Sequence, residues 1–128
     1  MAALIDTHTF LWLIADESRL GPNALSYFKD VANRIHLSIA SEWEIAIKVG
    51  KGRLSIDTSL RELLIDIPRR FNIDILTVQP QHLVAVSSLP RHRGDPFDRL
   101  IVAQSLVEGL PLVSADEELD QYGILRIW

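Results

Sequence analysis

Residues 2–14 read AALIDTHTFLWLI, and this stretch decides the fold. Its first four residues, AALI, are apolar and stop at Asp6, as expected of a short strand that is buried on both faces. Residues 7–14 follow with apolar side chains at helical spacing. A buried strand that runs directly into a helix begins a βαβ unit. The stretch therefore predicts a parallel sheet with helices packed on it.

The rest of the chain repeats this alternation of short apolar runs and helical patterns. Gly21-Pro22 opens a helix, because proline is favoured at an early helical position, and Gly109 ends one. The predicted fold class is α/β, with a mostly parallel sheet and helices on both of its faces. Besides residues 2–5 and 7–14, we expect strands at 35–38, 73–78, 112–114 and 124–127, and helices at 22–33, 42–50, 59–71, 80–88 and 96–108.

Length and composition indicate one globular domain, residues 1–128, with 48% hydrophobic and 23% charged residues. The sequence contains no cysteine, which excludes disulfides, thiolate metal ligands and a thiol nucleophile, and fits a reducing cytosol. No signal peptide is evident, and no apolar stretch approaches the roughly 18 residues of a membrane span. We therefore expect a cytoplasmic protein without a membrane segment.

Four carboxylates stand near the expected strand ends: Asp6, Glu44, Asp98 and Asp116. Ligands of α/β sheets bind at this carboxyl edge. Acids that converge there repel one another unless cations neutralise them, and no lysine follows a strand end. A bound cation is the simplest solution, and all-oxygen ligands favour Mg²⁺ or Mn²⁺. Such a site would suit hydrolysis of a phosphodiester by a metal-activated water.

The first two acids also have structural interpretations, which we favour when each acid is taken singly. Asp6 could cap the helix that begins at residue 7. Glu44 could be the third helical position of a capping box that begins with Ser41. Spacing alone does not choose between Glu42 and Glu44 as the acid of the site.

The other two acids have similar interpretations. Asp95 could cap the helix that starts at residue 96, and Asp98 could be a favourable acid in its first turn. Ser114 and Glu117 have the spacing of another capping box, in which Asp116 would be only a first-turn acid. Spacing alone leaves open which of Asp95 and Asp98 belongs to a metal site.

Four segments of the chain carry a resemblance to a known family. They read LIDTHTFLW (4–12), SIASEWEIAIK (38–48), DPFDRLIVAQ (95–104) and LPLVSAD (110–116). In order and spacing they resemble the PIN domain ribonucleases, and in particular the VapC-type toxins of prokaryotic toxin–antitoxin pairs. The similarity extends over nearly the whole chain. It implies a PIN-like three-layer α/β/α fold with a central, mostly parallel sheet of four to five strands.

The resemblance also implies roles for individual residues. The family's acidic metal-binding and catalytic quartet corresponds to Asp6, Glu44, Asp98 and Asp116. Glu42 occupies a position that is usually apolar in the pattern, so Glu44 is the implied ligand. Asp95 is implied to cap its helix while Asp98 binds the metal. Ser114 and Thr7, with Asp95, are the implied supporting residues around the site.

The function implied by the resemblance is that of a metal-dependent endoribonuclease with Mg²⁺ or Mn²⁺ as cofactor. The implied partners are an RNA substrate, a VapB-like antitoxin and a second copy of the chain in a homodimer. The alternative is a non-catalytic PIN-fold module that acts only by binding a protein. A haloacid-dehalogenase-like phosphatase is disfavoured, because His8 stands where that family has a second acid.

The net charge of −4 does not favour binding of nucleic acid by charge alone, since such proteins are basic. Local cations would have to contact RNA, and the candidates are Arg91, Arg93 and Arg99, although a solvated loop would explain them equally. An antitoxin helix would need an exposed apolar groove. The first two helices carry the apolar residues Trp12, Leu13, Leu20, Leu25 and Phe28. We expect most of these to pack in the core, and any that are exposed to form the groove.

Overall fold

The computed structural model describes residues 1–91 and 94–128 of the chain. Its centre is a five-stranded sheet in the order β3-β2-β1-β4-β5, with every neighbouring pair parallel. The strands are β1 (Ala2–Ile5), β2 (Arg34–Ser38), β3 (Ile73–Leu76), β4 (Leu112–Val113) and β5 (Arg126–Ile127). The helices are α1 (Thr7–Ala15), α2 (Pro22–Lys29), α3 (Ile39–Gly50), α4 (Ile67–Arg70), α5 (Pro80–Ser88) and α6 (Pro96–Glu108). The prediction of an α/β fold with a parallel sheet is confirmed.

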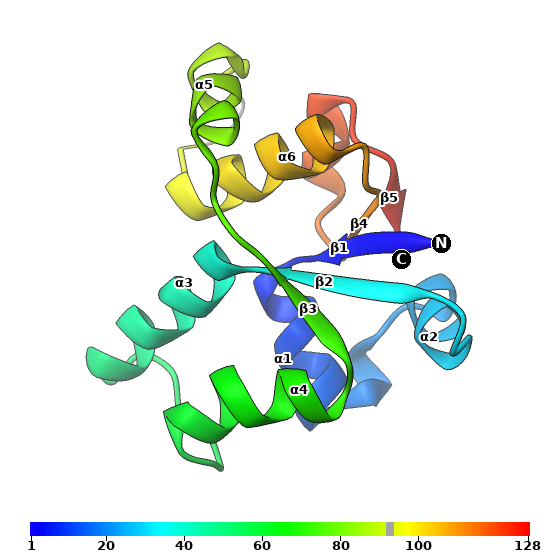
Figure 1. Ribbon diagram of the computed structural model, residues 1–128, viewed down its shortest axis with the longest axis vertical. Helices are drawn as coiled ribbons and strands as arrows, with labels where there is room; N and C mark the ends of the chain where they lie inside the picture. The colour runs from blue at the N-terminus through cyan, green and yellow to red at the C-terminus, as the bar shows by residue number, and fades with distance from the viewer. Residues whose placement is uncertain (92–93) are drawn as a thin grey trace.

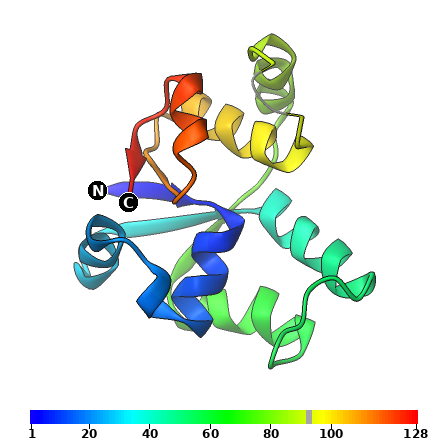
Figure 2. The ribbon, with the colours of Figure 1, turned by 180° about the vertical axis from the view of Figure 1, so that it is seen from behind.

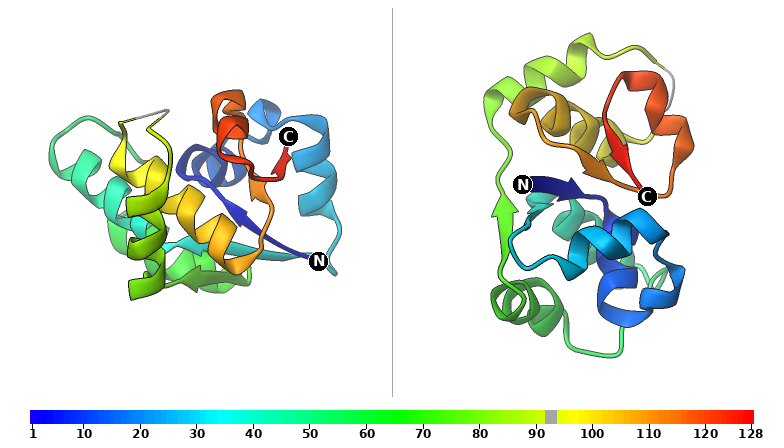
Figure 3. Two further views of the ribbon diagram at one scale, coloured as in Figure 1. Left: turned by 90° about the horizontal axis from the view of Figure 1, so that it is seen from above. Right: turned by 90° about the vertical axis from the view of Figure 1, so that its right-hand side faces the viewer.

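Helices cover both faces of the sheet, as Figure 1 shows and Figure 2 confirms from behind. Successive side chains of β1 point to opposite faces. Ala3 and Ile5 pack into a core with α1, α2, α3 and α4, whereas Leu4 packs with α6 on the other face. The two helical layers are seen apart, with the sheet between them, in the right-hand view of Figure 3. The expected three-layer arrangement is thus present.

The strand order reverses at β1, which pairs with β2 on one side and with β4 on the other. Ile5, the last residue of β1, pairs with Val113 at the end of β4 and with Leu37 in β2. The chain segments that follow β1, β2 and β4 therefore leave the sheet at the same edge. This reversal point is where α/β sheets bind ligands.

The helix after β2 begins three residues earlier than expected. Ser38 is its N-cap, and the Ser38 hydroxyl accepts a hydrogen bond of 3.0 Å from the Ala40 backbone N–H. α3 consequently starts at Ile39, and Ser41 already lies inside its first turn. The proposed capping box of Ser41 and Glu44 does not form, which leaves Glu44 without that structural role.

Some other elements are shorter or less regular than expected. β3 ends at Leu76 because its partner strand turns into α3 after Ser38, and β5 pairs only with the two residues of β4. The helix expected at 59–71 contains a π-helical turn, Glu62–Asp66, that precedes α4. Pro68 has no backbone N–H and crowds the turn before it, which accounts for this wider turn.

The end of the chain packs closely on the start of α2. A Cβ atom on Gly21 would lie 2.6 Å from Trp128 Cδ1, so only glycine fits at this position. The Asn23 backbone N–H donates to the Trp128 carbonyl at 3.2 Å. Within the two described segments, no helix is both long and apolar enough to cross a membrane.

Candidate functional site

Asp6 stands at the point where β1 ends and α1 begins. Its Oδ1 accepts a hydrogen bond of 2.8 Å from the Thr9 backbone N–H, so Asp6 is the N-cap of α1. Its Oδ2 accepts a hydrogen bond of 2.5 Å from the Ser114 hydroxyl, which comes from the end of β4. Each oxygen keeps a further lone pair. The carboxylate is therefore held in one orientation and can still accept another partner.

Ser114 connects Asp6 to the segment that carries Asp116. Ser114 is fully buried, and its Oγ also accepts a hydrogen bond of 3.1 Å from the Asp116 backbone N–H. Asp116 itself caps the short 3₁₀ helix Glu117–Tyr122, since its Oδ1 accepts from the Glu118 N–H at 3.1 Å. The capping box of Ser114 and Glu117 does not form. Ser114 instead links the two acids that follow β1 and β4.

Glu44 is buried, with 5% of its surface exposed, and both of its oxygens have partners. The Thr7 hydroxyl donates to Oε1 at 2.7 Å and lies 3.0 Å from the Ser41 hydroxyl. Lys48, one helical turn later, donates to Oε2 at 2.7 Å. Thr7 follows Asp6 directly, so this network brings Glu44 to the end of β1. Lys48 does not follow a strand, so strand-end placement does not indicate it as a counter-charge, but its i, i+4 spacing from Glu44 does.

Asp98 lies half-buried in the first turn of α6. Asp95 caps this helix, because its Oδ1 accepts from the backbone N–H groups of Phe97 at 2.8 Å and Asp98 at 3.1 Å. The start of α6 packs against α3, where the rings of Trp43 and Phe97 meet edge to face at 5.3 Å between centroids. Asp98 is thereby placed on a helix next to the one that carries Glu44.

In chemistry the four acids suit a hard divalent cation, since carboxylate oxygens are the ligands that such an ion prefers. Within residues 1–91 and 94–128, however, no three Asp, Glu or His side chains are arranged so that they could hold a metal ion together. One Glu44 oxygen is occupied by Lys48 in this arrangement. A single metal site made of all four acids remains a prediction.

The three arginines proposed to contact RNA differ in position. Arg99 is buried, and its guanidinium donates to the carbonyls of Pro90 at 2.8 Å and Val86 at 3.1 Å. It therefore stabilises the end of α5 and the turn after it, and the expectation that it contacts phosphate is corrected. Arg91 is exposed, as a phosphate contact must be. Arg93 lies outside the described residues.

Glu42 lies on α3 close to the candidate site but is not connected to it by a hydrogen bond in the described part of the chain. It is buried, with 8% of its surface exposed, and its Oε2 has no hydrogen-bond partner among the described residues. Burial raises the pKa of the Glu42 carboxyl from 4.5 to about 7. The sequence pattern marked Glu42 as unusual but did not show that it would be buried without a partner.

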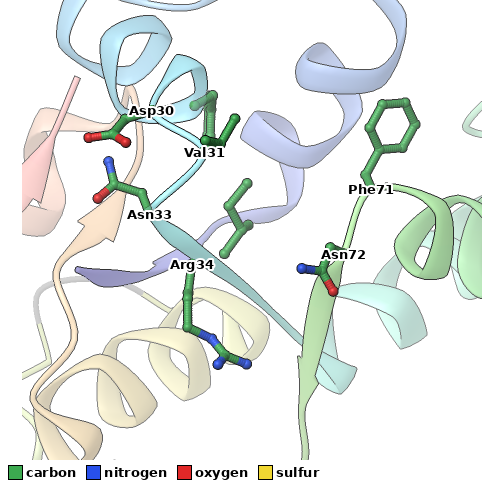
Figure 4. Close-up of a pocket in the computed structure, with 8 residues that line it drawn as sticks. Asp30, Val31, Asn33, Arg34, Phe71 and Asn72 are labelled. Carbon is green, nitrogen blue, oxygen red and sulfur yellow. The ribbon is translucent and has the colours of Figure 1, made fainter.

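A separate hollow of about 500 Å³ lies at the opposite edge of the sheet, near the starts of β2 and β3 (Figure 4). In Figure 4 the Arg34 side chain extends away from Asp30 and Val31, and Arg34 forms an ion pair of 2.6 Å with Asp74. The Asn33 side chain donates to a backbone carbonyl at 3.1 Å. The predicted acids do not line this hollow, so it is distinct from the candidate site.

A comparison with protein families matches residues 3–125 to the PIN domain. The chain belongs to the PIN domain family. Nucleases are typical of this family, which supports a hydrolase that acts on nucleic acids. The matched residues include all four predicted acids, β1 from its second residue onward, and the whole of β2, β3 and β4.

Solved structures of other PIN-fold chains have the same architecture. VapBC2 from Rickettsia felis, bound to a DNA fragment from its promoter, matches with a TM-score of 0.72 and 13% identity, over 98% of this chain and 97% of that one. VapBC-1 from nontypeable Haemophilus influenzae matches with a TM-score of 0.66 and 18% identity, over 98% and 96%. FitAcB from Neisseria gonorrhoeae matches with a TM-score of 0.63 and 16% identity, over 98% and 96%. At these identities the similarity shows the shared fold. A sequence comparison with curated proteins gives no match.

Proposed function

We propose that this PIN domain protein is a divalent-metal-dependent endoribonuclease and the toxin of a toxin–antitoxin pair. The observation that carries the proposal is the bridge made by Ser114, which donates to Asp6 and accepts from the Asp116 backbone where the strand order reverses. Glu44 reaches the same place through Thr7. A module that only binds protein has no need of such mutually repulsive acids, so their retention favours catalysis over the non-catalytic alternative.

The proposed cofactor is Mg²⁺ or Mn²⁺, and the residues that would hold it are Asp6, Glu44, Asp98 and Asp116. When bound, such an ion activates water and offsets the charge that develops on a phosphodiester. The ammonium of Lys48 neutralises Glu44 in the present arrangement, and 41% of the Lys48 side chain is exposed. Lys48 can therefore move into solvent when another cation takes its place beside Glu44.

The remaining polar residues have positioning roles in this proposal. Ser114 and the Thr9 N–H hold the Asp6 carboxylate, while Thr7 holds Glu44, so that neither side chain has to reorient when substrate arrives. Arg91 and Arg93 are the proposed phosphate contacts, since they precede the helix that carries Asp98. Because the net charge is −4, we expect RNA affinity to be local and sensitive to salt.

The proposed partner is an antitoxin, which the VapBC and FitAcB names of the similar structures support. The proposed binding site for the antitoxin is a hollow of about 450 Å³ between α1 and residues 54–63. Its apolar lining residues are Leu11, Trp12, Ile14, Leu54, Ile56 and Leu63. Of the apolar residues expected there, Trp12 lines the hollow. The other four, Leu13, Leu20, Leu25 and Phe28, belong to the core beneath α1 and α2. Core packing thus accounts for most of the five residues, as expected, and Trp12 is the one that lines the proposed groove.

A homodimer and a cytoplasmic location complete the proposal as expectations from the family resemblance. Sedimentation of the purified chain at several concentrations tests the dimer. The antitoxin would be supported by a neighbouring gene that encodes a small DNA-binding protein. If that protein copurifies with this chain but not with a Leu11→Glu variant, the proposed binding site is supported as well.

The decisive experiment measures cleavage of end-labelled RNA by the purified chain with Mg²⁺ or Mn²⁺ and with EDTA. We expect EDTA, Asp6→Asn and Asp98→Asn each to abolish cleavage while circular dichroism stays unchanged. Asp66→Asn is the matched control, because Asp66 is an exposed acid far along the chain from the site residues. Cleavage that persists in Asp6→Asn and Asp98→Asn at the rate of the control would refute the assignment.

A further inference from the structure

We propose that a groove beside Glu42 is a second docking site, for an amphipathic segment of a partner protein that carries an arginine or lysine on its apolar face. The Glu42 groove is a hollow of about 420 Å³ between α3 and the π turn, joined to a second hollow of about 270 Å³ that shares four of its lining residues. These shared residues are Ile39, Glu42, Leu64 and Ile65. α3 and the π turn before α4, which form the groove, lie on the same side of the sheet as α1 (Figure 1). The groove is lined neither by the four acids nor by the residues of the hollow of about 450 Å³ between α1 and residues 54–63, here called the α1 groove.

The base of the groove contains an unsatisfied acceptor. Glu42 lines both hollows, is more than nine-tenths buried, and its Oε2 has no partner in the part of the chain that the structure describes. Native proteins pair nearly all of their buried polar atoms, because an unpaired one loses its hydration without compensation. A donor that enters the groove from another molecule would supply this missing partner.

The walls and rim define what that molecule must look like. Ile39 and Trp43 are apolar side chains with 39% and 61% of their surface exposed, and they offer area for an apolar partner to cover. Arg61 and Arg69 are exposed at the rim, and no ion pair to either is found among the described residues. The complement of this pattern is a cation on the apolar face of the partner and acids at its flanks.

Other occupants fit the groove less well. RNA would bring phosphate to a buried carboxyl group, which repels it. A second copy of this chain whose two-fold axis passes through the groove would place the same concave surface against itself, and would leave the space unfilled with the two Glu42 residues facing each other. The segment of a different protein is the occupant that fills the hollow and neutralises its acid.

The backbone beside the groove is also unusual. Leu64 and Ile65 belong to the π-helical turn Glu62–Asp66, which widens the helix where it faces Glu42. Such turns are rare and occur frequently at functional sites. The turn gives the groove one wall whose shape an ordinary α-helix would not provide.

The test uses the full chain and two synthetic helical peptides of about 15 residues that differ at one position. Both have leucines at helical spacing and glutamates at their ends, and the central apolar position is arginine in one peptide and norleucine in the other. Titration calorimetry measures affinity, and amide chemical shifts locate the binding surface. We expect the arginine peptide to bind at least about tenfold more tightly, the range of a hydrogen bond to a charged group. The shifts should cluster on α3 and the π turn.

Two variants and a control assign the effect to the carboxyl group. Glu42→Leu and the isosteric Glu42→Gln should bind both peptides equally, whereas Glu17→Leu, an exposed glutamate outside the groove, should keep the preference for arginine. Equal binding of the two peptides to the unmodified chain would overturn the proposal, as would shifts confined to the α1 groove. Sedimentation that shows a dimer lost only in the Glu42 variants would identify a second copy as the occupant and also overturn it. None of these readouts depends on nuclease activity.

Discussion

Replacing Glu42 should change how the stability of this protein depends on pH. Glu42 is buried in an apolar groove with one oxygen unpaired, and burial raises its pKa from 4.5 to about 7. The folded state therefore binds its proton more tightly than the unfolded chain does. Between the two pKa values the unfolded state binds fewer protons than the folded one, so the free energy of unfolding falls as pH rises through this window.

The magnitude follows from the size of the shift. A difference of roughly 2.5 pKa units corresponds to about 3 kcal/mol, present in full only above the folded pKa. Below about pH 4.5 the carboxyl is protonated in both states and the cost vanishes. Glu42→Gln removes the titration while keeping the shape. Its free energy of unfolding relative to the unmodified chain should therefore rise by about 3 kcal/mol between about pH 4.5 and about pH 8.5.

Urea denaturation in EDTA at a series of pH values measures this difference. Glu17→Gln is the control, because it makes the same chemical change at an exposed glutamate outside the groove. A Glu42→Gln effect that stays constant within about 0.5 kcal/mol across the range would refute the reasoning. It would mean that the carboxyl group is solvated or paired in the folded protein.

Three further substitutions test the positions of other residues. Ser114→Ala removes the hydroxyl that holds the Asp6 carboxylate. We expect urea denaturation to show a free energy of unfolding lower by about 1–3 kcal/mol, and RNA cleavage to be slower. An unchanged cleavage rate would contradict the positioning role of Ser114. Arg99→Met should lower the free energy of unfolding by about 2–4 kcal/mol and speed hydrogen exchange at the end of α5. Arg91→Met should instead weaken RNA binding and leave the free energy of unfolding unchanged. The opposite pattern would mean that Arg91 has the structural role and Arg99 contacts RNA. Gly21→Ala places a Cβ 2.6 Å from Trp128 Cδ1, so thermal unfolding should show a loss of about 1–3 kcal/mol, and a neutral result would mean that the end of the chain is not packed there.

The fold could be predicted because strand and helix patterns alternate clearly along this chain. Of the four apolar residues before Asp6, Ala3, Leu4 and Ile5 are buried in β1 and Ala2 is half-buried at its start. The helix that follows ends within one residue of its expected end. Boundaries were less certain where a cap was overlooked. Ser38 reads equally well as the last residue of a strand and as an N-cap, and it is both, which moved the start of α3 to Ile39.

The sequence predicts which acids form the candidate site but not the local partners of its residues. The four acids are predicted from strand-end placement together with the family resemblance, and the strand order brings the segments that follow β1, β2 and β4 to one edge of the sheet. Lys48 was missed because the search for a counter-charge was limited to strand ends. Arg99 looked like part of a basic loop, and only the fold shows that its guanidinium faces the carbonyls that end α5.

Glu42 and Glu44 show why residue type and spacing could not assign roles by themselves. Two residues along a helix correspond to a rotation of about 200°, so the two side chains leave α3 on nearly opposite sides. Glu44 faces the end of β1, where Thr7 and Lys48 satisfy it, while Glu42 faces the π turn, where its Oε2 has no partner among the described residues. A single helix thus separates an acid that belongs to the proposed catalytic edge from one that belongs to the proposed docking groove. Substitutions at Glu42 should therefore alter partner binding and pH-dependent stability while leaving RNA cleavage intact, whereas substitutions at Glu44 should abolish RNA cleavage while leaving binding at the Glu42 groove intact.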